Sequence, residues 1–101
     1  MSLTVAMNTS LSGMQAYGAR AQAVANNVAN ADTPGYRRLE TSTAAMTGGG
    51  VAARVDDGDG DVDMATEMLD MMQAETGFMA NASAYQAGAD MWDVLMSLNR
   101  D

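Results

Sequence analysis

Carboxylates gather at two places in this sequence, and they are side chains that could bind a metal ion or transfer a proton. From residue 56 to residue 63, acids largely alternate with glycines, as at the start of a calcium-binding loop. In every frame, however, a required acid or the mid-loop glycine is missing. Glu67, Asp70 and Glu75 could lie near one another on a helix, but acids on an exposed helical face nearly always serve solvation. We therefore favour a solvated turn over a calcium site.

Methionine is overused, with eleven residues, while cysteine and histidine are absent. Thioethers could bind copper or haem, but without any histidine or cysteine they make a poor site. The same absences exclude thiol catalysis, disulfides, zinc sites of the Cys/His type and histidine acid-base chemistry. We therefore expect no enzyme activity, no cofactor and no metal, and we interpret the methionines as packing groups.

The charge balance bears on partners. Five arginines and no lysine stand against thirteen acids, which gives a net charge of −8. This charge argues against nucleic acid or an anionic membrane as a direct partner. No apolar run reaches the roughly eighteen residues of a membrane span, and the amino terminus does not resemble a secretory signal. We expect no membrane insertion, and export, if it occurs, without a cleaved signal peptide.

An asparagine cluster is followed by a sharp break in the helical pattern. Asn26, Asn27 and Asn30 each carry an amide that donates and accepts hydrogen bonds. One interpretation is structural: Asn30 and Asp32 satisfy loose backbone groups where a helix ends. The other is recognition, in which the asparagines fix the register between neighbouring chains. Residues 32–35 read as a fixed corner, with a proline that stops the helix and a glycine suited to positive φ.

Two long amphipathic helices must position these residues. The first, at about residues 3–31, has an apolar stripe broken only at Ser10. The second, at about 62–99, has a clearer stripe and Asp61 or Asp63 as its cap. The first stripe comprises Leu3, Met7, Met14, Tyr17, Ala21, Val24 and Val28, and the second Met64, Met68, Met71, Phe78, Ala82, Tyr85, Ala89, Trp92 and Met96. We expect Trp92 to be a buried anchor on its stripe.

The predicted fold is all-α, with the two helices packed as an antiparallel hairpin or coiled coil and joined by an irregular middle that can hold a short β-hairpin. We divide the chain into residues 1–36, a flexible connector at 37–61, and residues 62–101. A hairpin alone would leave apolar residues outside its seam, so we expect further partners. The residues outside the seam are Leu11, Leu69, Met72, Met79 and Leu95.

Four glycines lie inside the helical patterns: Gly13, Gly18, Gly77 and Gly88. At about 1 kcal/mol each relative to alanine, they would cost the isolated helices roughly 4 kcal/mol. Either this is tolerated weakness, or the glycines allow helices to pack closely while marginal stability keeps the subunit exportable.

Both ends of the chain resemble the bacterial flagellar rod and hook family. Residues 12–14, Arg20 and 26–37 are similar to its amino-terminal signature, which runs from Ser-Gly-Leu through Asn-Asn-Ile-Ala-Asn to Thr-x-Gly, an aromatic and a basic residue. Residues 62–74, Phe78 and 80–82 are similar to its carboxy-terminal segment. The chain departs from the family at residues 75–78 and at Ala21. Its middle segment is even more compact than expected of the smallest rod proteins, so the resemblance implies either a minimal proximal-rod-like protein or a divergent relative with an altered role.

The resemblance implies a structural subunit of the flagellar basal-body rod, which assembles into an axial tube that transmits torque for motility. Its partners would be itself, other rod and hook-basal-body proteins, and the flagellar type III export apparatus. It would reside in the rod that spans the periplasm. The alternative is a cytoplasmic helical adaptor or export chaperone that binds partner helices through its methionine-rich face.

We predict two groups of assembly and packing residues. The first group forms the corner of the family signature: Asn27, Asn30, Thr33, Gly35 and Tyr36. The second group packs helices: Met64, Met68, Phe78, Asn81, Tyr85 and Trp92.

Overall fold

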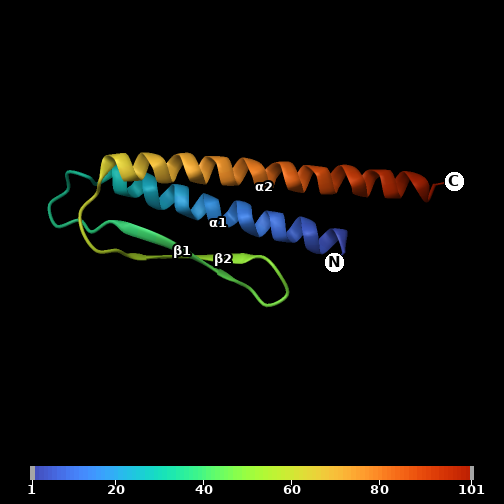
Figure 1. Ribbon diagram of the computed structural model, residues 1–101, viewed down its shortest axis with the longest axis horizontal. Coiled ribbons are helices and arrows are strands. Elements are labelled where there is room, and N and C mark those ends of the chain that lie inside the picture. Colours follow the sequence, from blue (N-terminus) through green and yellow to red (C-terminus); the bar gives the residue numbers. More distant parts are fainter. Residues whose placement is uncertain (1, 101) are drawn as a thin grey trace.

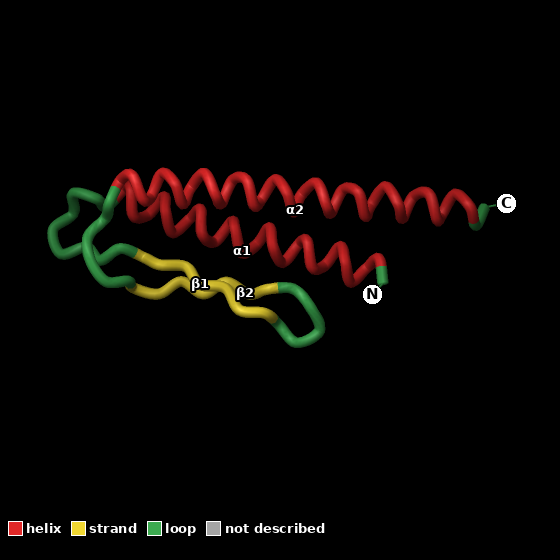
Figure 2. The backbone as a smooth tube through the Cα atoms, in the orientation of Figure 1, coloured by secondary structure: helices red, strands yellow, loops and turns green. Residues whose placement is uncertain are grey.

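Two antiparallel helices and a β-hairpin form three elongated layers in the computed structural model, which describes residues 2–100 (Figure 1). The elements follow the order α1 (Leu3–Ala29), β1 (Leu39–Ala45), β2 (Val51–Asp57) and α2 (Met64–Leu98). Figure 2 shows α1 in the middle, with α2 along one side and the hairpin along the other. The molecule measures 66 × 24 × 14 Å. The predicted two-helix fold with a short β-hairpin is confirmed.

Local signals set the ends of both helices. The Ser2 hydroxyl accepts a hydrogen bond from the Val5 amide and caps α1, which ends where Asn30 leaves helical geometry. Asp63 caps α2 through the Ala65 amide, as predicted. Gly35 has φ +77°, so the expected positive-φ corner is also confirmed. Within residues 2–100, no helix is long and apolar enough to cross a lipid bilayer.

The hairpin turns through the glycine run and is fastened to α1. Strands β1 and β2 pair antiparallel from Leu39 opposite Asp57 to Ala45 opposite Val51. The turn uses positive φ at all three glycines from residue 48 to residue 50, which side chains rarely tolerate. At the end of the turn, the Val51 amide donates to the Ser12 hydroxyl of α1, so the hairpin lies against the middle of that helix.

Glycines bring the two helices into close contact. A methyl group at Gly77 would collide with the Tyr17 ring, and one at Gly13 would lie 2.5 Å from the Asn81 side chain. Met7 approaches Gly88 in the same way. The two residue numbers in each facing pair add up to 94 or 95, which is the constant sum expected of an antiparallel pair. At three of the four helical glycines, an added methyl group would therefore force the facing side chain to shift.

The inner face of α2 is displaced from the predicted stripe. Its inner positions follow a seven-residue spacing at Glu67, Ala74, Asn81 and Gly88. Trp92 is 47% exposed, so the expectation that it is a buried anchor is wrong for the single chain. Most large residues of the predicted α2 stripe therefore lie outside the contact between the helices, and α2 contributes mainly small or polar residues to that contact.

Candidate functional site

Asn27 lies at the centre of the signature corner. It is 1% exposed, and its amide uses all of its hydrogen-bonding capacity. Its Nδ2 donates to the Leu39 carbonyl at 3.0 Å and to Glu67 Oε1 at 3.1 Å. Its Oδ1 accepts from the Leu39 amide and from the Tyr36 hydroxyl, each at 2.7 Å. One side chain therefore pairs with both backbone groups of Leu39, as a neighbouring strand would, and joins α1, β1 and α2.

The other signature residues close the corner locally. The Tyr36 hydroxyl accepts from Asn26 Nδ2 at 2.8 Å while it donates to Asn27. Asn30 Nδ2 donates to the Asn26 carbonyl, and Thr33 Oγ1 donates to Asn30 Oδ1 at 3.2 Å. These contacts support the structural interpretation of Asn30, which satisfies the end of its own helix. Asp32 was also expected to satisfy backbone groups at this helix end, but within residues 2–100 its side chain forms no hydrogen bond in the corner.

Arg38 ties the corner to α2 by charge. Its Nε donates to Glu67 Oε1 at 2.8 Å, and its terminal nitrogens reach Glu40 at 2.8 Å and Asp70 at 3.3 Å. The hydrogen bond to Glu67 raises the pKa of Arg38 above its ordinary value, although burial acts in the opposite direction. The Glu67 side chain is completely buried, so this pair differs from surface ion pairs that water screens.

The interpretation of these acids as solvation was wrong for Glu67, which is 0% exposed, and for Asp70, which is partly buried and bonds Arg38. Arg38 was not predicted as a site residue at all. A signal was present in the seven-residue spacing that places Glu67 in line with Ala74 and Asn81. The larger methionine stripe concealed that spacing.

The predicted packing residues of α2 divide into one inner residue and five outer ones. Asn81 faces Gly13 of α1 and donates to the Gly77 carbonyl at 2.9 Å. The other five are exposed in the single chain: Met64, Met68, Phe78, Tyr85 and Trp92. The most exposed of them is Met68, at 62%. Their contribution to assembly stays a prediction, since it needs a second molecule.

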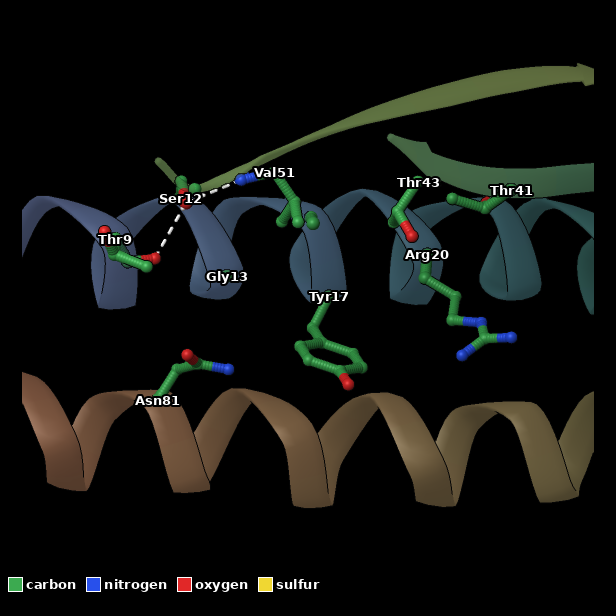
Figure 3. Close-up of a pocket in the computed structure, with 11 residues that line it drawn as sticks. Thr9, Ser12, Gly13, Tyr17, Arg20, Thr41, Thr43, Val51 and Asn81 are labelled. Carbon is green, nitrogen blue, oxygen red and sulfur yellow. Dashed lines mark hydrogen bonds between the residues drawn. The ribbon is translucent and has the colours of Figure 1, made fainter. Parts of the chain in front are cut away.

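A cavity of about 340 Å³ lies between the hairpin and the helix pair (Figure 3). Thr41 and Thr43 face it from the hairpin, and Tyr17, Arg20 and other side chains face it from the helices. Across residues 2–100, no group of three or more acidic, cysteine or histidine side chains is placed to hold a metal ion. The hydrogen bonds and ion pairs of the corner hold α1, β1 and α2 together.

Comparison with known families matches both helices. The family described as flagella basal body rod protein matches residues 7–37, which comprise most of α1 and the corner. The family described as flagellar basal body rod FlgEFG protein C-terminal matches residues 61–98, which comprise α2. The chain belongs to the flagellar rod and hook family.

Individual relatives agree with this family assignment. Flagellar hook protein FlgE of Brucella suis biovar 1 (strain 1330) is 48% identical over 46 residues, which are 46% of this chain and 12% of the relative. The same-named protein of Rhizobium meliloti (strain 1021) is also 48% identical over 46 residues, 46% of this chain and 11% of its own length. The alignment thus spans only about an eighth of these relatives.

The two segments that match the family models are the two helices that pack together. The segments matched by the two families are far apart in sequence, and the fold lays them side by side as α1 and α2. Asn27 and Arg38 secure the end at which they are joined. In this member of the flagellar rod and hook family, a β-hairpin of seven-residue strands occupies the space between the matched segments.

Proposed function

We propose that this protein is a structural subunit of the flagellar basal-body rod and assembles through its two terminal helices into the axial tube. The observation that carries the proposal is the pairing of α1 with α2, the two family segments, with a broad apolar surface left exposed on the pair. Four side chains in the first half of α2 are about three-fifths exposed: Met68, Leu69, Met72 and Met79. Exposed apolar area of this extent on a thin helical pair indicates that other helices cover it.

The short middle favours the rod over the hook in this proposal. Only 34 residues separate the ends of α1 and α2, and they form a corner and one hairpin. The similar hook proteins are much longer, since the aligned part is an eighth of their length. A thin subunit suits a slender tube that transmits torque and crosses the periplasm. Its partners would be further copies, other rod and hook-basal-body proteins, and the flagellar type III apparatus that exports it without signal cleavage.

The experiment is deletion of the gene, followed by motility microscopy, purification of hook-basal bodies and mass spectrometry of the particles. Loss of rods and hooks on deletion, together with the protein in wild-type particles and recovery by the intact gene, is the expected result. Intact rods that lack the protein would overturn the axial role. Cells that fail to export flagellar proteins while the protein stays in the cytoplasm would favour the adaptor or export chaperone.

A further inference from the structure

The carboxyl-terminal part of α2 extends past α1. Met7 and Leu3, in the first turns of α1, both approach Gly88, so α2 extends past the start of α1 from about one turn beyond that position (Figure 1). We define residues 90–98 as the α2 overhang. Six large apolar residues of the overhang are exposed: Met91, Trp92, Val94, Leu95, Met96 and Leu98. No described part of the chain covers this dense apolar segment, although it continues the helix whose earlier turns pack on α1.

The overhang is also acidic. Asp90 and Asp93 lie one turn apart on it, and neither belongs to an ion pair within residues 2–100. They lie close to the apolar side chains of the same turns, so a surface that covered the overhang would meet two carboxylates at its border. Such a surface would be complementary only if it carried a positive charge.

A matching surface lies elsewhere on the same molecule. A shallow groove between α1 and α2 is lined by Tyr17, Arg20, Leu69, Met72 and Gly77, and we call it the Arg20 groove. Two of these residues, Leu69 and Met72, are each 61% exposed. The hairpin does not line this groove, so the groove is open to another molecule.

Arg20 gives the groove its charge. It is the only charged residue of α1, and within residues 2–100 it forms no hydrogen bond or ion pair. Glu67 and Asp70 also lie beside it, but both carboxylates bond Arg38 instead. Figure 3 shows the Arg20 side chain extending from α1 toward α2. A partly buried guanidinium without a partner is well placed to receive a carboxylate from outside.

We propose that this protein assembles head to tail, with the α2 overhang of one copy docked in the Arg20 groove of the next copy and Asp90 and Asp93 facing Arg20. The proposal rests on the axial role above and names the partner as a second copy of this chain. The two surfaces fit in length, since residues 90–98 and the groove segment 69–77 are each about 13 Å long as helix. The other acidic stretch, residues 56–63, has Val62 as its single apolar side chain and so offers little for the groove to bury.

The proposed contact joins two different surfaces of the molecule and is therefore heterologous. Overhang and groove are different surfaces, so each docked copy leaves one of each free for further copies. A heterologous contact of this kind generates a ring if its rotation closes and a filament if it does not. Pairing of overhang with overhang would instead give a closed dimer, in which Arg20 takes no part, so Arg20→Glu alone would leave its association unchanged.

The test uses two charge-reversed forms of the full chain, Arg20→Glu and the double variant Asp90→Arg with Asp93→Arg. Association is measured by sedimentation velocity and by the emission of Trp92, the single tryptophan, which lies in the overhang and should shift to the blue when covered. Arg54→Glu, at an exposed hairpin position, is the control with the same charge change as Arg20→Glu. Circular dichroism checks that each variant is folded.

The wild type and the control should associate as concentration rises. Each charge-reversed form alone should need at least about tenfold higher concentration. An equimolar mixture of the two should recover wild-type association, because each groove then meets an overhang of opposite charge. A folding defect would not be repaired by mixing.

A mixture that stays dissociated, or charge-reversed forms that associate like the wild type, would overturn the head-to-tail contact. So would a wild type that stays monomeric throughout. If the monomeric protein is nevertheless found in purified hook-basal bodies, the axial role stands and the overhang binds a different partner.

Discussion

Replacement of Asn27 by alanine should reveal how strongly the corner holds the fold. The substitution removes four hydrogen bonds, to the amide and carbonyl of Leu39, to Glu67 and to the Tyr36 hydroxyl. At about 1 kcal/mol for each bond, the loss is about 4 kcal/mol. Small domains have only about 5–15 kcal/mol in total, so the variant should be close to unfolding.

Asn30→Ala is the matched control. It removes the same type of side chain three positions later, but its bonds lie at an exposed helix end. Exposed hydrogen bonds of this kind contribute about 1 kcal/mol in total. The two variants should therefore differ by about 3 kcal/mol in the free energy of unfolding.

Urea unfolding followed by far-ultraviolet circular dichroism measures that difference. Hydrogen exchange adds a local reading, since the Leu39 amide donates to Asn27 at 2.7 Å and should lose protection in Asn27→Ala. Equal stability of the two variants, or an unchanged hydrogen-exchange rate at the Leu39 amide, would show that Asn27 does not stabilise the corner. If Asn27→Ala were stable but failed only in rod assembly, register between neighbouring chains would be the better interpretation.

Three further changes test the rest of the structure. Gly77→Ala places a methyl group against the tyrosine ring opposite it and should destabilise the fold by about 1–3 kcal/mol. Gly18→Ala meets open space and should stabilise the fold by up to about 1 kcal/mol. Thermal unfolding compares the two variants, and similar effects on stability would contradict the register of the helices. Arg38→Met strands a buried glutamate and should cost about 3–5 kcal/mol in urea, whereas Arg37→Met, at a 63% exposed pair, should change little. Trp92→Ala should change the unfolding free energy of the isolated monomer by no more than about 0.5 kcal/mol, since the ring is half exposed there; a large loss would mean that it packs within the chain.

The sequence was most informative where a single residue restricts its own backbone. The corner follows from Pro34 and Gly35, the α2 cap from Asp63, and both helices from sustained seven-residue patterns. These signals are local, and the structure agrees with them. The hairpin was anticipated only in outline, because its strands are short and only half-buried on one side.

The sequence pattern predicted the wrong face of α2 for the contact with α1. Hydrophobicity selects the methionine and aromatic stripe of α2, but the tight approach of α1 admits only small side chains at Ala74 and Gly77. The length of Tyr17 and the need for space around it decide this, and a pattern confined to one helix does not contain that information. Arg38 and Glu67 were missed for the same reason, since their partnership joins positions 29 residues apart.

Taken together, the buried and exposed groups invert the usual arrangement of a globular protein. The two fully buried large side chains are polar, Asn27 and Glu67, whereas most large apolar side chains of α2 are exposed. Hydrogen bonds and charge pairs are directional, so they can fix one geometry at the corner without a large apolar core. Apolar contacts are less directional and remain available to whichever surface covers them. A chain built in this way holds its hairpin shape by its polar corner and gains most of its burial from neighbours, which is the division of forces that an assembling subunit requires.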